Sequence, residues 1–265
     1  MIQKLSPNPT ETSSSALSRW VPMPRYLLRL WVVKRIVRRL KPKSFIEIGA
    51  ASGHIAQWMS EQCGMRGTAV EISPLALTMM RERLRGNSLV RIFDRDSREL
   101  PSDTKAEMLL SMEVLEHIED DDAALQNWFD LILPSGYLIL SVPAHQSKFS
   151  AEDEMVGHFR RYDKQPLCDQ LARIGFDQIK VYSYGFPLGL LLKALRTKVA
   201  CRSLQSDQRT TQERTEASGV ERERWLSLRW LLNDFWMLPF HLLQMLFLSC
   251  DWSDGYIAVA RKPVR

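Results

Sequence analysis

The stretch FIEIGAASGH, residues 45–54, joins a short apolar run to a segment of small residues. Gly49 and Gly53 bracket two alanines and a serine, and Glu47 lies just before them. Such a loop lets the backbone approach a ligand closely and presents free N–H groups at the start of a helix. A phosphate-binding P-loop needs Gly-Lys-Ser/Thr at its end, whereas His54 and Ile55 follow Gly53. The sequence therefore excludes a P-loop.

The spacing of the small residues separates two further classes of nucleotide-binding loop. A nicotinamide or flavin loop reads GxGxxG, and its third glycine lets the helix pack closely on the strand. Counted from Gly49, these positions hold Gly49, Ala51 and His54, and a histidine fits the third position poorly. The spacing Gly49–Ala51–Gly53 after Glu47 instead matches an acidic residue followed by GxGxG. We therefore disfavour an oxidoreductase that uses an adenosine cofactor.

A second carboxylate stands where an adenosine ligand would need it. Glu71 ends the next apolar run, GTAVEI. A carboxylate at the end of this strand can accept hydrogen bonds from both hydroxyls of a ribose, in nicotinamide and S-adenosylmethionine sites alike. Glu71 thus supports an adenosine ligand without naming it, and the alternative is a charged strand end that faces water.

From about Ser44 to Phe176 these motifs resemble the class I S-adenosylmethionine-dependent methyltransferases, with Ala51 in place of the middle glycine. The resemblance implies S-adenosyl-L-methionine as cofactor, with the loop under its methionine part. It also implies that Asp96, rather than Asp94, contacts the adenine amino group. The cofactor-binding residues it predicts are Glu47, Gly49, Ala51, Gly53, Glu71, Ile72, Asp96, Ser97, Met112 and Glu113.

The segment SMEVLEH resembles the same family in members that methylate small molecules. Methyltransferases of nucleic-acid bases tend to carry an Asp/Asn-Pro-Pro-aromatic loop there, and that loop is absent. We therefore expect no nucleic-acid partner. Glu116 and His117 are metal-ligating residue types, but no third ligand follows at a suitable spacing, so no metal site is predicted.

The acceptor side is expected after the fifth strand, in VPAHQSKFSAEDEMVGHFRRYDK. This segment resembles the GHxRRY segment of a small-molecule branch of the family, similar to ubiquinone and menaquinone methylases. An oxygen acceptor must lose its proton, and a neutral histidine is the usual proton acceptor. We therefore predict His145 or His158 as the base, with Asp153, Arg160, Arg161 and Tyr162 at the substrate. The alternative is that Arg160 and Arg161 only fix the loop by pairing with Asp153 and Glu154.

Apolar strands alternate with helical patterns along most of the chain, which argues for a parallel sheet covered by helices. We predict an α/β fold with a Rossmann-like, seven-stranded, mostly parallel sheet, helices on both faces and a helical insertion before the last strand. The expected divisions are a disordered tail (1–23) and a methyltransferase domain (24–265). Within the domain we expect a cofactor-binding core (44–183), an insertion (187–254) with a flexible loop (202–224), and a last strand (255–261).

Composition suggests a cytoplasmic protein. The chain has 265 residues, a net charge of +5, and four cysteines without a CxxC pair, which suits a reducing compartment. From Leu30 to Leu40 a helical pattern has one apolar and one basic face, and residues 235–250 are strongly apolar. These two features are either ordinary surface and core, or a peripheral contact with an anionic membrane that would suit a lipid-linked acceptor.

The prediction is an S-adenosylmethionine-dependent methyltransferase that acts on a small-molecule or lipid-linked acceptor, by O- or C-methylation. The alternatives are a nucleic-acid methyltransferase and a non-catalytic module that binds the adenosine cofactor. The sequence does not indicate an oligomeric state.

Overall fold

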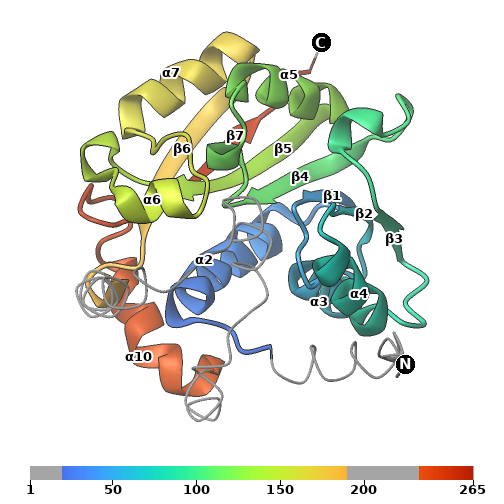
Figure 1. Ribbon diagram of the computed structural model, residues 1–265, viewed down its shortest axis with the longest axis horizontal. Coiled ribbons are helices and arrows are strands. Elements are labelled where there is room, and N and C mark those ends of the chain that lie inside the picture. The colour runs from blue at the N-terminus through green and yellow to red at the C-terminus, as the bar shows by residue number, and fades with distance from the viewer. Residues whose placement is uncertain (1–19, 190–232, 265) are drawn as a thin grey trace, which may run out of the picture.

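The fold is a single twisted sheet of seven strands between two layers of helices (Figure 1). The computed structural model describes residues 20–189 and 233–264. Strands β1 to β6 run parallel, and β7 lies antiparallel between β5 and β6, giving the order β3-β2-β1-β4-β5-β7-β6. The predicted seven-stranded, mostly parallel sheet is confirmed. The strands are β1 (Ser44–Ile48), β2 (Arg66–Val70), β3 (Val90–Phe93), β4 (Ala106–Met112), β5 (Ile132–Pro143), β6 (Asp177–Tyr184) and β7 (Gly255–Arg261).

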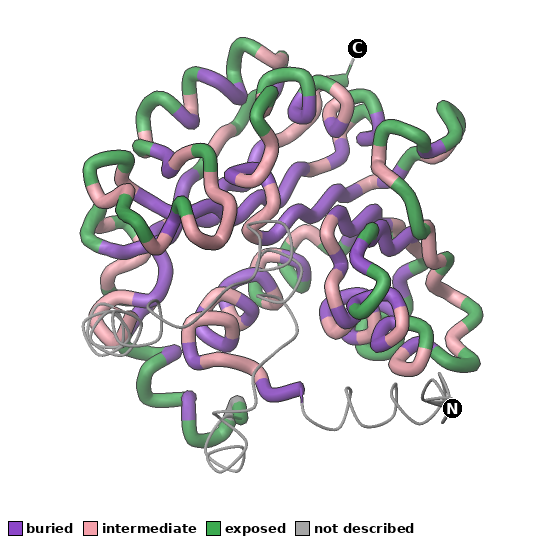
Figure 2. Tube along the Cα trace, viewed as in Figure 1, coloured by how far each residue is buried: buried purple, intermediate pink, exposed green. Residues whose placement is uncertain are grey.

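Alternate side chains of the inner strands point to opposite helical layers. On β4, Leu109 packs in the cluster that includes α5 and α7, whereas Met108 and Leu110 pack with α2 and α3. The central strands are therefore buried on both faces (Figure 2). The helices are α2 (Pro24–Leu40), α3 (His54–Cys63), α4 (Pro74–Arg83), α5 (Asp121–Leu131), α6 (Ala151–Met155), α7 (Lys164–Ile174) and α10 (Asp234–Met245), with short 3-10 turns η1 (Ser97–Glu99), η2 (Leu115–His117) and η3 (Gln146–Lys148).

Helix α2 begins earlier than the periodicity from Leu30 indicates. Pro24 occupies the first turn, where a missing N–H costs nothing, and the helix then runs to Leu40. The extra turns carry Arg25 and Arg29 to the carboxyl edge of the sheet, where their side chains meet Glu113. The basic face expected further along the helix is present, because the side chains of its arginines are exposed (Arg35, Arg38 and Arg39).

The connection between β6 and β7 begins and ends at the carboxyl edge of the parallel strands, because β7 runs antiparallel to its neighbours. Its described part includes α10, which packs on α2 through buried Met237 and through Gln244, whose side-chain amide donates to the Leu28 carbonyl oxygen at 3.2 Å. The predicted flexible loop 202–224 lies outside the described residues, as do residues 1–19 of the predicted tail. Within the described residues, none of the helices combines the length and apolar character needed to cross a bilayer.

Candidate functional site

The loop between β1 and α3 turns sharply because three of its residues have left-handed backbone. Gly49, Ala51 and Gly53 have φ angles of 71°, 46° and 72°. A side chain at Gly49 would place its Cβ 2.4 Å from Val114 Cγ2, and one at Gly53 would lie 2.7 Å from Met80 Cγ. The two glycines are therefore required by conformation and by space. Ala51 shows that an alanine can occupy the middle position of this loop in a conformation that L residues rarely adopt.

Glu71 faces this loop from the end of β2, as predicted. Its Oε2 accepts a hydrogen bond from the Ala51 N–H at 2.7 Å, and its Oε1 accepts from the N–H groups of Ile72 and Ser73 at 2.8 and 2.9 Å. The backbone therefore orients the carboxylate toward the glycine turn. Ile72, beside it, is 67% exposed, so an apolar side chain is available to pack on a base next to a carboxylate that can bind a ribose.

Glu47 is buried beneath the loop on β1, and among the described residues one of its oxygens, Oε2, has no hydrogen-bond partner. Burial raises the pKa of this carboxyl to about 8; the Ala56 N–H and Arg29 lower it, and Glu71 raises it further. An unsatisfied carboxyl oxygen beside the loop suits the ammonium of an amino-acid moiety.

The third strand leads to Asp96 and Ser97, at the first residues of η1. Asp96 caps this turn through the Arg98 N–H at 2.8 Å and pairs with the Arg98 guanidinium at 2.9 Å. Hydrogen bonds from Arg98 lower the pKa of Asp96, although partial burial opposes them. The rival residue, Asp94, is exposed and pairs with Arg81 instead. Asp96 can therefore contact an adenine only by sharing its carboxylate with Arg98 or releasing it.

Met112 ends β4 and Glu113 follows it, where four side chains of the described residues contact the Glu113 carboxylate. Arg25 and Arg29 of α2 lie 3.1 and 3.2 Å from its oxygens, and the hydroxyls of Ser141 and Tyr184 donate to it at 3.0 and 3.2 Å. Burial raises the pKa of Glu113, but Arg25, Arg29, the Ser141 hydroxyl and His158 together lower it to about 2.

The sequence patterns did not indicate that Arg25 and Arg29 pair with Glu113. Arg25 and Arg29 precede the part of α2 with a clear apolar face, and their basic character resembles that of the exposed face. Only their spacing of four residues, which places both on one side of a helix, could have indicated a shared target.

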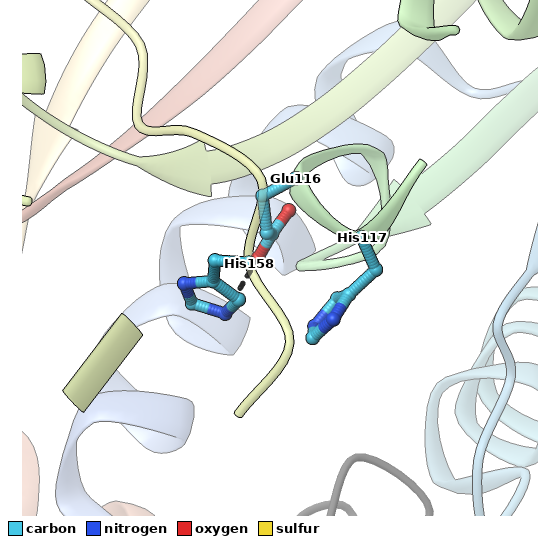
Figure 3. Close-up of side chains that lie close together, drawn as sticks. All are labelled: Glu116, His117 and His158. Carbon is cyan, nitrogen blue, oxygen red and sulfur yellow. Dashed lines mark ion pairs between the residues drawn. The ribbon is translucent and has the colours of Figure 1, made fainter. Parts of the chain in front are cut away.

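A second group of side chains gathers beyond β4 (Figure 3). Glu116 and His117 come from η2, and His158 comes from the segment after α6. His158 Nε2 lies 3.8 Å from Glu116 Oε1, and the two imidazoles pack edge to face with centroids 4.7 Å apart. Burial and the neighbouring Glu113 carboxylate raise the pKa of Glu116 well above its usual range.

His145, the other predicted base, follows the end of β5 with a left-handed φ of 65°. Its Nδ1 lies 3.5 Å from the Tyr256 hydroxyl. Its Nε2 is 3.7 Å from Asp251 Oδ1 and has no hydrogen-bond partner in residues 20–189 and 233–264. The structure thus places the two predicted bases in separate groups, one beyond β5 and one beyond β4.

The predicted substrate residues are joined to one another and to the fold. Asp153 bonds both His158 Nδ1 and Arg161 at 2.9 Å, and Arg161 also reaches Asp254 at 2.9 Å. Arg160 pairs with Asp121 at 2.6 Å, and the Tyr162 hydroxyl donates to the same residue at 2.9 Å. Asp153 and Arg161 are buried, which agrees with the alternative that the arginines fix the loop. Among the described residues, Arg161 forms ion pairs with Asp153 and Asp254, and the expected pairing with Glu154 is not one of them.

A hollow of about 470 Å³ lies beside α7 and is lined by Arg161, Tyr162 and Gln170 among others. Another, of about 340 Å³, is lined by Ser44, Arg66 and Val90 at the amino ends of the strands. Neither hollow is lined by the Gly49–Gly53 loop. The features that indicate a cofactor site are the loop itself and the carboxylates beside it. The left-handed turn, the oriented Glu71, exposed Ile72 and the unsatisfied Glu47 oxygen fit an aminoacyl nucleoside.

A family model described as a methyltransferase domain matches residues 22–181, more than half of the chain. The chain belongs to the methyltransferase domain family. It is an enzyme of the S-adenosylmethionine-dependent class, as the sequence predicted. The ubiquinone-like branch stays a prediction, because the family match is broader than that branch.

A curated relative is Nodulation protein S of Sinorhizobium fredii, which is 26% identical over 97 residues. The match spans 36% of this chain and 44% of that protein, which is less than half of its length.

Solved structures share the fold at low sequence identity. Phosphoethanolamine N-methyltransferase 2 of Haemonchus contortus with S-adenosyl-L-methionine has a TM-score of 0.56 and 16% identity, covering 87% of this chain and 52% of that one. The N-methyltransferase NodS of Bradyrhizobium japonicum with S-adenosyl-L-homocysteine has a TM-score of 0.52 and 14% identity, covering 97% and 100%.

Proposed function

We propose that this methyltransferase acts on a small-molecule acceptor that binds at the carboxyl edge of the sheet, beside β4 and β5. The observation that carries the proposal is the hydrogen bond from the Ala51 N–H to Glu71, which joins the glycine turn to a carboxylate suited to a ribose. The acidic and imidazole side chains that follow β4 and β5 supply the neighbouring polar surface.

The residues of this chain bind and orient the two reactants. When bound, S-adenosylmethionine supplies an electrophilic methyl group on a positively charged sulfur. Glu71 would accept hydrogen bonds from the ribose hydroxyls, and Ile72 would pack on the base. Methyl transfer is an in-line displacement, so the largest contribution of the protein is to align the acceptor with the methyl carbon.

An acceptor hydroxyl must lose its proton to become a good nucleophile, and we assign His145 as the proton acceptor. His145 lies at the carboxyl end of β5 and is held less tightly than His158. Its Nδ1 lies 3.5 Å from the Tyr256 hydroxyl, whereas His158 Nδ1 lies 2.9 Å from Asp153. The Nε2 atoms of both have a carboxylate nearby, Asp251 at 3.7 Å from His145 and Glu116 at 3.8 Å from His158. We favour O- or C-methylation. N-methylation is the runner-up, because two of the similar solved structures are named as N-methyltransferases.

Cofactor binding tests the proposal directly. Isothermal titration of the full chain should show binding of S-adenosylmethionine and S-adenosylhomocysteine and none of NAD. Glu71→Ala should weaken this binding by about 1–3 kcal/mol, because charge-assisted hydrogen bonds to the ribose are lost. Glu61→Ala, an exposed site on α3, is the matched control and should bind normally. Equal affinity in the Glu71 variant would overturn the ribose assignment.

Turnover tests the base and separates an enzyme from a module that only binds the cofactor. With a deuterated methyl donor and fractionated small-molecule extracts, mass spectrometry identifies any methylated product. His145→Ala should then lower kcat/KM about 10²–10⁴-fold while cofactor affinity is unchanged, because general-base catalysis is lost. Unchanged kcat/KM in this variant would remove His145 from the mechanism.

We also propose a cytoplasmic protein that associates with a membrane and takes a lipid-linked acceptor. The support is α10 and the residue after it, where Phe235, Leu242 and Leu246 are among the large apolar side chains left exposed. Several exposed apolar side chains on one short segment favour an interaction site.

A further inference from the structure

We propose that Glu116, His117 and His158 form a binding site for one divalent transition-metal ion. Each side chain offers one nitrogen or oxygen ligand atom, and the three atoms lie within 4.8 Å of one another (Figure 3). Two imidazoles and one carboxylate are a ligand set that zinc and its neighbours accept, with positions left open for water or another ligand.

The environment of the Glu116 carboxyl group indicates that a ligand binds there. Its side chain is fully buried, and within the described part of the chain neither Oε1 nor Oε2 has a hydrogen-bond partner. Buried carboxylates are normally paired, hydrogen-bonded or bound to a metal. Arg25 and Arg29 lie nearby, but the ion pairs that they form are with Glu113.

Both histidines are oriented as metal-binding histidines usually are. A ligating imidazole commonly donates its second ring N–H to a carboxylate or a backbone carbonyl, which fixes the ring and its tautomer. His158 Nδ1 lies 2.9 Å from Asp153 Oδ1, and His117 Nδ1 lies 3.2 Å from the Gly157 carbonyl oxygen. Donation from these two nitrogens leaves each Nε2 without a proton, with a lone pair that can bind a metal ion.

The distances suit a site that tightens when an ion binds. Ligand atoms at about 2.0–2.1 Å from a tetrahedral zinc ion are about 3.3–3.5 Å apart. His158 Nε2 and Glu116 Oε1, at 3.8 Å, are within half an ångström of that separation. Asp153, which orients His158, forms a buried ion pair with Arg161. This ion pair therefore helps to hold His158 in position.

The site also suggests what the ion would do, a consequence that rests on the proposed function. Glu116 and His117 follow β4, which is adjacent to the strand that carries the glycine loop, and His158 joins them from the segment after α6. An acceptor hydroxyl at an open position of the ion would have a lowered pKa. A histidine whose Nε2 binds a metal cannot accept that proton, so His158 becomes a metal ligand and His145 remains the base.

Metal binding can be measured without any activity. The full chain, made without a histidine tag and treated with a chelator, is titrated with Co²⁺ and then with Zn²⁺. We expect visible d–d absorption from one Co²⁺ per chain, which Zn²⁺ displaces. Glu116→Gln and His158→Ala should each weaken Co²⁺ binding at least about tenfold, in line with the loss of a metal-site residue.

His145→Ala is the matched control, because it removes a histidine from the neighbouring group and should leave the Co²⁺ spectrum unchanged. Circular dichroism of each variant verifies folding, and Glu116→Gln preserves the side-chain shape. A folded wild-type chain without stoichiometric Co²⁺ or Zn²⁺ binding would overturn the site, as would variants that bind like the wild type. Selective binding of Mg²⁺ or Ca²⁺ would also overturn it, since these ions prefer oxygen ligands. Titration with S-adenosylmethionine is a separate readout, so failure of the metal site is distinguishable from failure of the proposed function.

Discussion

Ionisation of the buried Glu47 carboxyl lowers the stability of the folded state. Its pKa is raised by burial to about 8, whereas an unfolded chain would titrate near 4.5. Between these two values the folded state binds more protons than the unfolded state, so stability falls as pH rises from about 4.5 to about 8. The carboxyl is therefore neutral in the apoprotein at moderately acidic pH and becomes increasingly costly above it.

Glu47→Gln should remove this dependence. The amide resembles the protonated carboxyl, so the variant should match the wild type near pH 5. It should exceed the wild type by about 4 kcal/mol in the free energy of unfolding near pH 8, where the buried Glu47 would otherwise be half charged, because each unit of pKa shift is worth about 1.36 kcal/mol. Urea denaturation at several pH values, without cofactor, measures the difference. A constant offset across this range would contradict the assigned pKa.

Among the elements, α2 is joined to β4 by charge as well as by packing. Glu113 receives both Arg25 and Arg29, and the arginine side chains are 28% and 11% exposed. Removing one member of a partly buried cluster leaves an unpaired charge and costs more than the cluster contributes.

Glu113→Gln should therefore lower the free energy of unfolding by about 2–4 kcal/mol. Combining it with Arg29→Met should recover part of the loss, because one unpaired cation is removed. Glu61→Gln on the exposed side of α3 is the control and should change little. Additive losses in the double variant would show that Arg29 and Glu113 are not energetically coupled.

The sequence could predict the features that depend on residues close together in the chain. The β1 loop, α3 and Glu71 depend on a nearby strand, a turn of small residues and a short helix, so their motifs predict them. The meeting of Glu116 with His158, and of Arg25 with Glu113, depends on the tertiary fold. No spacing rule brings residues from α2 or from the segment after α6 to the end of β4.

For the molecule as a whole, α10 and the basic face of α2 are the surfaces that would meet a membrane. Replacing Phe235, Leu242 and Leu246 together by Ser should reduce co-sedimentation with anionic lipid vesicles several-fold, because these exposed side chains would insert into the interface. Replacing Arg35, Arg38 and Arg39 by Gln should instead weaken mainly the salt-sensitive part of binding. Complete recovery of the wild type in the supernatant at low salt would contradict membrane association.

The antiparallel placement of β7 has a consequence for how such enzymes diverge. The end of β6 and the start of β7 lie at the same edge of the sheet. The residues between them can therefore be lengthened or substituted while every strand keeps its pairing. Loop closure is cheap in this respect, since doubling the length of a flexible connection costs only about 0.6 kcal/mol. A change in this one segment would thus leave the glycine turn of β1 and the Glu71 carboxylate in place.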